Sequence, residues 1–119
     1  SGGIPLQIAK DDGYDKFLVI MSRERSYVKP PVTRPAMMRR IFRKNPAVAE
    51  AIINRPDRYN ATRAQLFELE RQGKAVLFFP DEMKMSNRER DLAKLNAAYE
   101  TGLKQAEREW PKWAEFFGA

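Results

Sequence analysis

The sequence contains no cysteine and no histidine. Without cysteine the chain can form neither disulfides nor thiolate metal sites, and this composition is compatible with a reducing compartment. Without histidine it lacks the commonest metal ligand and the general base of Ser-His-Asp and Cys-His catalytic sites. We therefore expect no metal ion, no cofactor and no catalytic residue of these classes in the chain.

Long hydrophobic runs are also absent. No run approaches the roughly 20 apolar residues that cross a bilayer, and no apolar segment follows a basic N-terminus as in a secretory signal. We expect a soluble, cytoplasmic protein, with a peripheral membrane location left open by the charge pattern described next. We interpret residues 1–3 as a flexible leader or cloning remnant and residues 4–119 as a single domain, since 119 residues of 43% hydrophobic content can form one core.

Positive charge is concentrated in one stretch of the sequence. The net charge is +6, yet residues 1–22 carry −1 and residues 45–119 carry 0. The stretch between them, called the basic segment below, has Glu24 as its only acidic residue. Its eight basic residues are Arg23, Arg25, Lys29, Arg34, Arg39, Arg40, Arg43 and Lys44. A field of one sign favours an anionic partner, such as phosphate headgroups, nucleic acid or an acidic surface.

Two short apolar runs predict strands. Phe17–Met21 follows a polar turn marked by Gly13, and Ala75–Phe79 is closed by Pro80. Neither run alternates between apolar and polar residues, so we expect both strands to be covered on both faces. A long helical connection between them predicts parallel pairing with a right-handed crossover.

The sequence before the first strand ends in an acidic turn. We expect a short helix over residues 4–10, with a proline in its first turn, where a missing N–H costs little. Asp11, Asp12 and Asp15 follow it, and their spacing lacks the alternating ligands and the distal Glu of a calcium loop. We interpret these three residues as part of a helix-ending turn and expect no metal ion there.

Two helices are expected within the crossover, after the basic segment. The pair Asn45-Pro46, a capping residue followed by a first-turn proline, predicts the start of one helix, which should end at Pro56. Asp57 should cap the next helix, and Gly73 should end it.

The last helix should begin near Asp91, and Pro111 should kink or break it. Its C-terminal part is rich in aromatic residues, which either pack against the body of the protein or form a membrane or dimer contact. These residues are Trp110, Trp113, Phe116 and Phe117.

A short basic amphipathic helix is expected over residues 36–43, after an extended proline-rich loop over residues 26–35. Its apolar side carries four residues: Met37, Met38, Ile41 and Phe42. Two interpretations remain open, because this side either faces the core or lies among the headgroups of an anionic membrane. Nucleic acid is an unlikely partner: Tyr27 and Phe42 could stack on bases, but no motif of a known recognition module is present.

Short stretches spread from Ile4 to about Gln105 carry a family resemblance. They are Ile4-Pro5-Leu6-Gln7, Ala9, Asp12-Gly13-Tyr14-Asp15-Lys16, Val19-Ile20, Arg23, Tyr27, Lys29-Pro30, Tyr59-Asn60, Leu69, Gly73-Lys74, Tyr99 and Gly102. Together they resemble the C-terminal part of bacterial patatin-like phospholipases. The resemblance implies an α/β acyl hydrolase with a Ser-Asp dyad, its serine in a Gly-x-Ser-x-Gly motif and its aspartate in an Asp-Gly-Gly motif.

The catalytic motifs of that family are missing from this sequence. It contains no Gly-x-Ser-x-Gly motif. Ser1-Gly2-Gly3 has Ser in place of the Asp of Asp-Gly-Gly, and it lies closer to Ile4-Pro5-Leu6 than the family spacing implies. No catalytic residue of the family can therefore be assigned to any position here, and we expect no catalysis from this chain alone.

These observations predict an α/β fold, a predominantly helical fragment with two short parallel strands joined by a helical crossover. Because parallel sheets are normally larger and covered on both faces, we expect the fragment to belong to a larger patatin-like sheet. The resemblance implies the C-terminal structural region of a lipid acyl hydrolase. Its expected partners are the upstream catalytic region of the same polypeptide, an anionic phospholipid membrane and a second copy of the chain. The alternative is an independent basic module that binds anionic lipid surfaces or nucleic acid.

Overall fold

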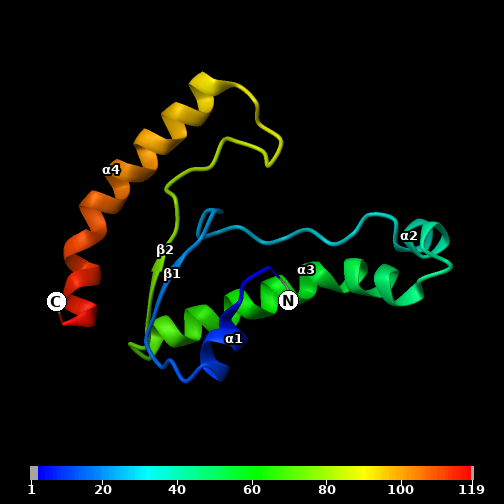
Figure 1. Ribbon diagram of the computed structural model, residues 1–119, viewed down its shortest axis with the longest axis horizontal. Coiled ribbons are helices and arrows are strands. Elements are labelled where there is room, and N and C mark those ends of the chain that lie inside the picture. The colour runs from blue at the N-terminus through cyan, green and yellow to red at the C-terminus, as the bar shows by residue number, and fades with distance from the viewer. Residues whose placement is uncertain (1–2, 119) are drawn as a thin grey trace. The chain divides into compact units, whose positions relative to one another are not determined.

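The computed structural model describes residues 3–118 and combines helices with two short parallel strands (Figure 1). The elements in chain order are α1 (Leu6–Asp11), β1 (Phe17–Ile20), α2 (Pro35–Ile41), α3 (Pro46–Arg71), β2 (Ala75–Phe78) and α4 (Leu92–Phe117). The α/β class is therefore confirmed at a coarse level. Ser1 and Gly2, which belong to the expected leader, lie outside the described residues.

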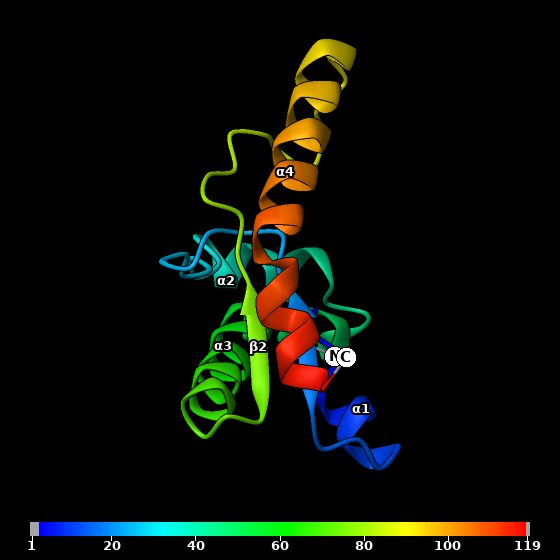
Figure 2. The same cartoon turned by 90° about the vertical axis from the view of Figure 1, so that its left-hand side faces the viewer.

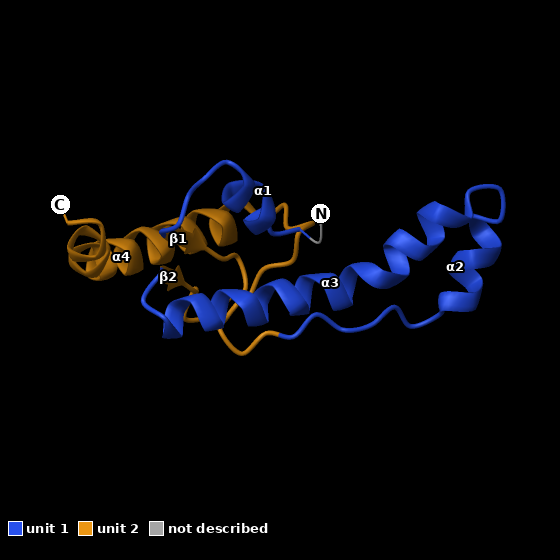
Figure 3. Ribbon diagram, turned by 90° about the horizontal axis from the view of Figure 1, so that it is seen from below, with its two compact units in different colours: residues 1–16, 28–74 blue, residues 17–27, 75–119 orange. Residues whose placement is uncertain are grey.

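The chain divides into two compact units that alternate along the sequence (Figure 3). Unit 1 contains the chain up to Lys16 together with residues 28–74, and therefore α1, α2 and α3. Unit 2 contains residues 17–27 and the chain from Ala75 onward, and therefore β1, β2 and α4. That residues 4–119 form a single domain stays a prediction.

The two strands of unit 2 pair in parallel, as the long helical connection predicts. Phe17 lies opposite Ala75, and Ile20 lies opposite Phe78. One residue beyond β1, the backbone N–H of Met21 donates to the carbonyl of Phe78 at 2.9 Å, so the pairing reaches the end of both strands. The right-handed sense of the crossover stays a prediction.

The strands differ in how well they are covered. All four residues of β2 are buried, as expected for a run without alternation. The same expectation is wrong for β1, where Phe17 is buried but Ile20 is 67% exposed. An apolar run thus indicates that a strand can be covered on both faces, but the surrounding elements decide whether it is.

The core of unit 2 forms where α4 packs on the strands, an arrangement visible in Figure 2. Val76 and Phe78 of β2 and Trp113 of α4 make a buried cluster, with the rings of Phe78 and Trp113 edge to face at 5.6 Å. Trp113 therefore packs against the body of the unit. Trp110 is 61% exposed and Phe117 is 48% exposed, so the aromatic end of the chain is divided between core and surface.

Helix α4 begins as predicted, and of the kink or break expected at Pro111 it shows no break. The carboxylate of Asp91 accepts hydrogen bonds from the backbone N–H groups of Ala93 and Lys94, which is an N-cap. The helix then continues through Pro111 to Phe117. A proline removes a single N–H from the helical ladder, and the burial of Trp113 one half-turn later holds both sides of the position in one helix.

Helix α3 replaces the two crossover helices that we expected. It begins at Pro46 and ends before Gly73, which has a φ of +75°, so both predicted ends are confirmed. The expected break at Pro56 is wrong, because the helix continues through it, and Asp57 consequently caps nothing. Pro56 is itself buried, and its packing offsets the lost N–H. The side chain of Asn45 makes no capping hydrogen bond in the described chain.

Candidate functional site

Of the four apolar residues at α2, two are exposed to solvent. None of the seven residues of this helix is buried, although it packs against α3. Met37 is 47% exposed and Ile41 is 64% exposed, whereas Met38 and the following Phe42 are half-buried. The four residues proposed for membrane contact therefore divide into an exposed pair and a half-buried pair.

The basic residues around α2 are exposed, and one of them is paired. Nε of Arg39 donates to Oε1 of Glu50 on α3 at 2.7 Å, and the two side chains are about half exposed. This hydrogen bond lowers the pKa of Glu50 and raises that of Arg39. Four further basic residues are exposed at or near the two ends of α2: Arg34, Arg40, Arg43 and Lys44. Cationic groups thus lie beside the exposed Met37 and Ile41.

Lys29 has a local structural environment in unit 1. The side-chain amide of Asn60 on α3 accepts from the backbone N–H of Lys29 at 2.9 Å and donates to its carbonyl at 3.0 Å. Nζ of Lys29 lies 5.1 Å from the centre of the Tyr59 ring, within the range of a cation–π contact. Asn60 thus anchors the proline-rich loop to α3, and the ammonium group of Lys29 rests on an aromatic face.

Arg63 is a cation of unit 1 that the sequence pattern did not single out. It is only 4% exposed, and its guanidinium lies 5.9 Å from the ring centre of Tyr59 and 5.6 Å from that of Phe67. The three residues follow each other at i, i+4 and i+8 on α3, which places them on one side of the helix. An arginine with an aromatic residue four positions before it and another four positions after it can stack on their rings. The same spacing also occurs around arginines that are exposed, so it does not identify a stacked arginine by itself.

The structure does not bring the eight basic residues into one unit. Arg23 and Arg25 belong to unit 2, whereas the other six belong to unit 1. Arg23 lies 5.3 Å from the ring centre of Tyr27, and Arg25 lies 5.3 Å from that of Phe79. The cationic surface on α2 is therefore considered by itself below.

In unit 2, the connection between β2 and α4, residues 79–91, is held by one buried amide. Gln105 of α4 is 5% exposed, and its Nε2 donates to the carbonyl of Phe79 at 2.6 Å. Its Oε1 accepts from the backbone N–H of Asp81 at 3.0 Å. Gln105 therefore completes the backbone hydrogen bonding of the chain just beyond the end of β2. The sequence pattern did not identify this residue, because it lies among the polar residues of an amphipathic helix.

A second contact links the connection to the chain that follows β1. Oε1 of Glu24, the only acidic residue of the basic segment, accepts from the backbone N–H of Met83 at 2.8 Å. The segments that leave the carboxyl ends of the two parallel strands are thus joined to each other. In open α/β sheets this end of the strands is where ligands bind.

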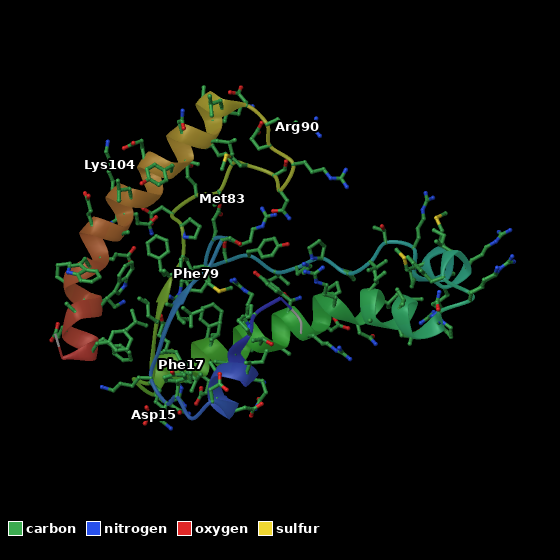
Figure 4. The ribbon with its side chains drawn as sticks, viewed as in Figure 1. Asp15, Phe17, Phe79, Met83, Arg90 and Lys104 are labelled. Carbon is green, nitrogen blue, oxygen red and sulfur yellow. The ribbon has the colours of Figure 1, made fainter. Side chains whose placement is uncertain are left out.

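An apolar cavity of about 560 Å³ lies within unit 2, between residues 80–85 of the connection and the first half of α4. Figure 4 shows Phe79 and Met83 on this connection. Apolar side chains from the strand ends and from the connection line it, together with small residues of α4. The apolar lining residues are Met21, Phe78, Pro80, Met83, Met85, Ala97, Ala98 and Gly102.

The described residues offer neither a membrane-spanning helix nor a metal site. No helix among residues 3–118 is long and apolar enough to cross a membrane. Within the same range, no group of three or more potential metal-ligating side chains gathers at one place. Asp12 ends α1, and Gly13 follows with a φ of +91°, so the acidic stretch forms the expected turn.

Comparison with protein-family models gives a match in the C-terminal part of the chain. Residues 45–118, which include α3, β2 and α4, match the family model described as Domain of unknown function (DUF6363). No curated protein and no solved structure is significantly similar to the chain. Because the matched residues make up more than half of the sequence, this chain belongs to the DUF6363 family.

Proposed function

We propose that this chain is the C-terminal structural region of a patatin-like phospholipase, a lipid acyl hydrolase whose Ser-Asp dyad lies upstream. In this role the chain completes the α/β fold and supplies no catalytic group. The proposal is motivated by the residue pattern that resembles the C-terminal part of that family. One observation of the structure supports it, namely an incompletely covered two-stranded parallel sheet.

That sheet is smaller than parallel sheets normally are. No third strand pairs with β1 or β2 within residues 3–118, so each strand has one outer backbone edge. Ile20 at the end of β1 is 67% exposed although its run has the composition of a covered strand. Parallel sheets occur almost only with more strands and with both faces covered. An upstream region that adds strands and covers Ile20 would remove both irregularities.

The proposal is tested with the gene product that contains this chain together with its upstream sequence. We expect that sequence to contain Gly-x-Ser-x-Gly and Asp-Gly-Gly motifs, and the longer protein to hydrolyse a short-chain nitrophenyl ester. Residues 1–119 alone should show no turnover above buffer, because their sequence contains no histidine, no cysteine and no Gly-x-Ser-x-Gly motif. An upstream sequence without either motif would contradict the proposal, as would turnover by the isolated chain that a serine-directed phosphonate abolishes.

The surface of α2 favours a second role, contact with anionic membranes. Met37 and Ile41 are exposed next to the arginines of the same helix, which is the composition of a helix that lies in the headgroup region. Each basic group near an anionic surface contributes about 1 kcal/mol, or roughly fivefold in partitioning. This role is compatible with the structural one, and it also describes the alternative in which the chain is an independent binding module.

Vesicle co-sedimentation tests the membrane role. Replacing Arg39, Arg40 and Arg43 together by Gln should weaken binding to anionic vesicles and leave neutral vesicles unaffected. The matched control replaces three exposed basic residues of unit 2, Arg88, Arg90 and Lys104, and loses the same charge. Equal losses in both triple variants would show that only net charge matters. Wild-type binding by the α2 variant would show that the helix does not contact the membrane.

The same measurement distinguishes lipid from nucleic acid. Binding of a single-stranded oligonucleotide that falls steeply with salt, together with no binding to anionic vesicles, would favour the nucleic-acid alternative. We expect the opposite preference, because the exposed Met37 and Ile41 can insert among lipid headgroups and have no use on a phosphate backbone.

A further inference from the structure

Helix α4 of unit 2 carries a line of large apolar side chains that are exposed to solvent. Five residues form this line, called the α4 stripe below: Leu92, Tyr99, Leu103, Trp110 and Phe117. The last four follow the first by 7, 11, 18 and 25 positions. At 3.6 residues per turn, each of these spacings returns to within about 20° of the same side of the helix. Each of the five residues is between 42% and 70% exposed, so the stripe is open along the whole of α4.

The charges of α4 favour a protein partner for this stripe over a membrane. Between Leu92 and Phe117 the helix has four basic and four acidic residues, a net charge of 0. Helices that lie in a membrane interface are instead rich in Lys and Arg on their polar side. At 1.5 Å per residue the stripe is about 38 Å long. A partner that covers it along its whole length is therefore an elongated element such as another helix.

The spacing of the large residues at the two ends of the stripe is symmetric. Leu92 and Phe117 lie equally far from the midpoint of α4, and so do Tyr99 and Trp110. Leu103 lies beside that midpoint. A second copy turned by 180° about an axis through the midpoint therefore brings Leu92 against Phe117, and Tyr99 against Trp110. This is the self-complementary contact of a two-fold dimer, in which each pair of residues occurs twice.

The area of the stripe is sufficient for a contact between two copies. Three of its residues are aromatic, and aromatic side chains bury about 150–250 Å² each. Since about half to two-thirds of each is exposed, they offer about 250–450 Å² per copy. With the two leucines included, a dimer buries on the order of 1,000 Å², the size at which specific interfaces begin.

We infer that two copies of this chain associate through the α4 stripe, with the two helices antiparallel. The inference rests on residues of unit 2 alone and requires no upstream hydrolase, so it is independent of the proposed function. The contact also differs from a continuation of the sheet, because it includes neither β1 nor β2.

Sedimentation equilibrium tests the surface with two double variants. Tyr99→Gln with Trp110→Gln should weaken self-association at least about thirtyfold, because buried aromatic residues carry much of the affinity of an interface. Both side chains are exposed in the single chain, so the variant should fold, and the fluorescence of the buried Trp113 reports this. The control, Ile8→Gln with Val28→Gln, removes exposed apolar side chains outside α4 and should associate like the wild type.

Two results of this experiment would overturn the inference. One is a wild-type chain that stays monomeric throughout the micromolar range. The other is unchanged association of the folded α4 variant, which would show that the copies join elsewhere, for example at the open edges of the sheet.

Distances between spin labels test the antiparallel arrangement. Because the sequence contains no cysteine, one introduced cysteine carries a unique label. Ala93→Cys and Lys104→Cys place it at exposed positions on the same side of α4. Position 104 lies at the midpoint, so two labels there should be within about 25 Å, given helix axes about 8–10 Å apart. Labels at position 93 should be about 35 Å apart along the helix. Short distances at both positions would indicate parallel helices, and long distances at both would exclude the α4 contact.

Two glutamates beside the stripe provide an independent test. Glu100 and Glu107 are exposed and lie about 60–80° from Leu92 around the helix, both on the same side of the stripe. In the antiparallel dimer, Glu100 of each copy lies next to Glu107 of the other. Such an exposed pair of like charges weakens association only about twofold, so apolar burial outweighs it.

Reversing these charges in one copy should therefore favour a mixed dimer. Glu100→Lys with Glu107→Lys, mixed with the wild type, should form a heterodimer about tenfold tighter than either homodimer, because two repulsive pairs become attractive. The control, Asp57→Lys with Glu115→Lys, makes the same change of charge at exposed positions away from the stripe and should show no such preference. The same preference in both mixtures, or in neither, would overturn the antiparallel arrangement.

Discussion

Ile20 provides the most direct test of whether β1 belongs to a larger sheet. Its side chain is 67% exposed in this chain, so Ile20→Asp removes little buried apolar surface. In the isolated chain we expect the free energy of unfolding to fall by no more than about 1 kcal/mol, the range of strand propensity and surface substitutions.

The same substitution should be severe in the longer protein if the upstream region covers β1. Complete burial of an isoleucine side chain contributes about 1.5–3 kcal/mol. An unpaired carboxylate at a covered position adds a desolvation penalty to that loss. We therefore expect Ile20→Asp to lower the free energy of unfolding of the longer protein by at least about 3 kcal/mol, and to reduce its ester hydrolysis through loss of folded enzyme.

Urea unfolding of both lengths, followed by tryptophan fluorescence, measures the two effects. Val28→Asp is the matched control, because Val28 is 70% exposed but lies outside both strands. Its effect should be small and equal in the two lengths. If Ile20→Asp also has a small and equal effect in both, nothing covers β1 in the longer protein, and the reasoning that makes this chain part of a larger sheet is refuted.

Three further predictions concern this chain alone. Gln105→Leu should lower the free energy of unfolding by about 1–3 kcal/mol, because the carbonyl of Phe79 and the N–H of Asp81 lose their partner, and urea unfolding measures this. Hydrogen bonds from Arg71 and Gln72 lower the pKa of Glu68 from 4.5 to about 2. The stabilisation that the ionised Glu68 gives to the end of α3 should therefore be complete above pH 4.5 and be lost as the pH falls toward 2. Amide exchange at that end should show this pH dependence, and Glu68→Gln should remove it. Light scattering should show dimers or larger species, since the described sheet has open edges; a monomer that melts cooperatively at micromolar concentration would contradict this.

Several features of the fold could be predicted because their causes are local. The continuous apolar runs at residues 17–21 and 75–79 identified both strands, and the length of the intervening helical segment predicted their parallel pairing. Asp91 caps α4 and Gly73 follows the end of α3 because each needs only its immediate neighbours to do so.

The two internal prolines show where local reasoning failed. Pro56 and Pro111 each remove one helical hydrogen bond, and sequence alone cannot say whether packing outweighs that loss. In both helices it does, with Pro56 itself buried in α3 and Trp113 buried just after Pro111 in α4. Two predicted helices therefore became one, and the last helix, for which a kink or a break was expected at Pro111, has no break.

In the candidate sites, too, some features follow from the sequence and others only from the packing. The sequence by itself determined that eight basic residues lie between Arg23 and Lys44, because charge is a property of composition. Only the tertiary structure decided that these residues divide between two units and that Arg39 pairs with Glu50.

The cavity depends wholly on the tertiary structure. Gln105 meets Phe79 across 26 positions, and Glu24 meets Met83 across 59. These partners are specified by how β1, β2 and α4 pack and not by the residues on either side of them. Local propensities act over a few neighbouring residues, whereas a site assembled from distant segments exists only once the chain has folded.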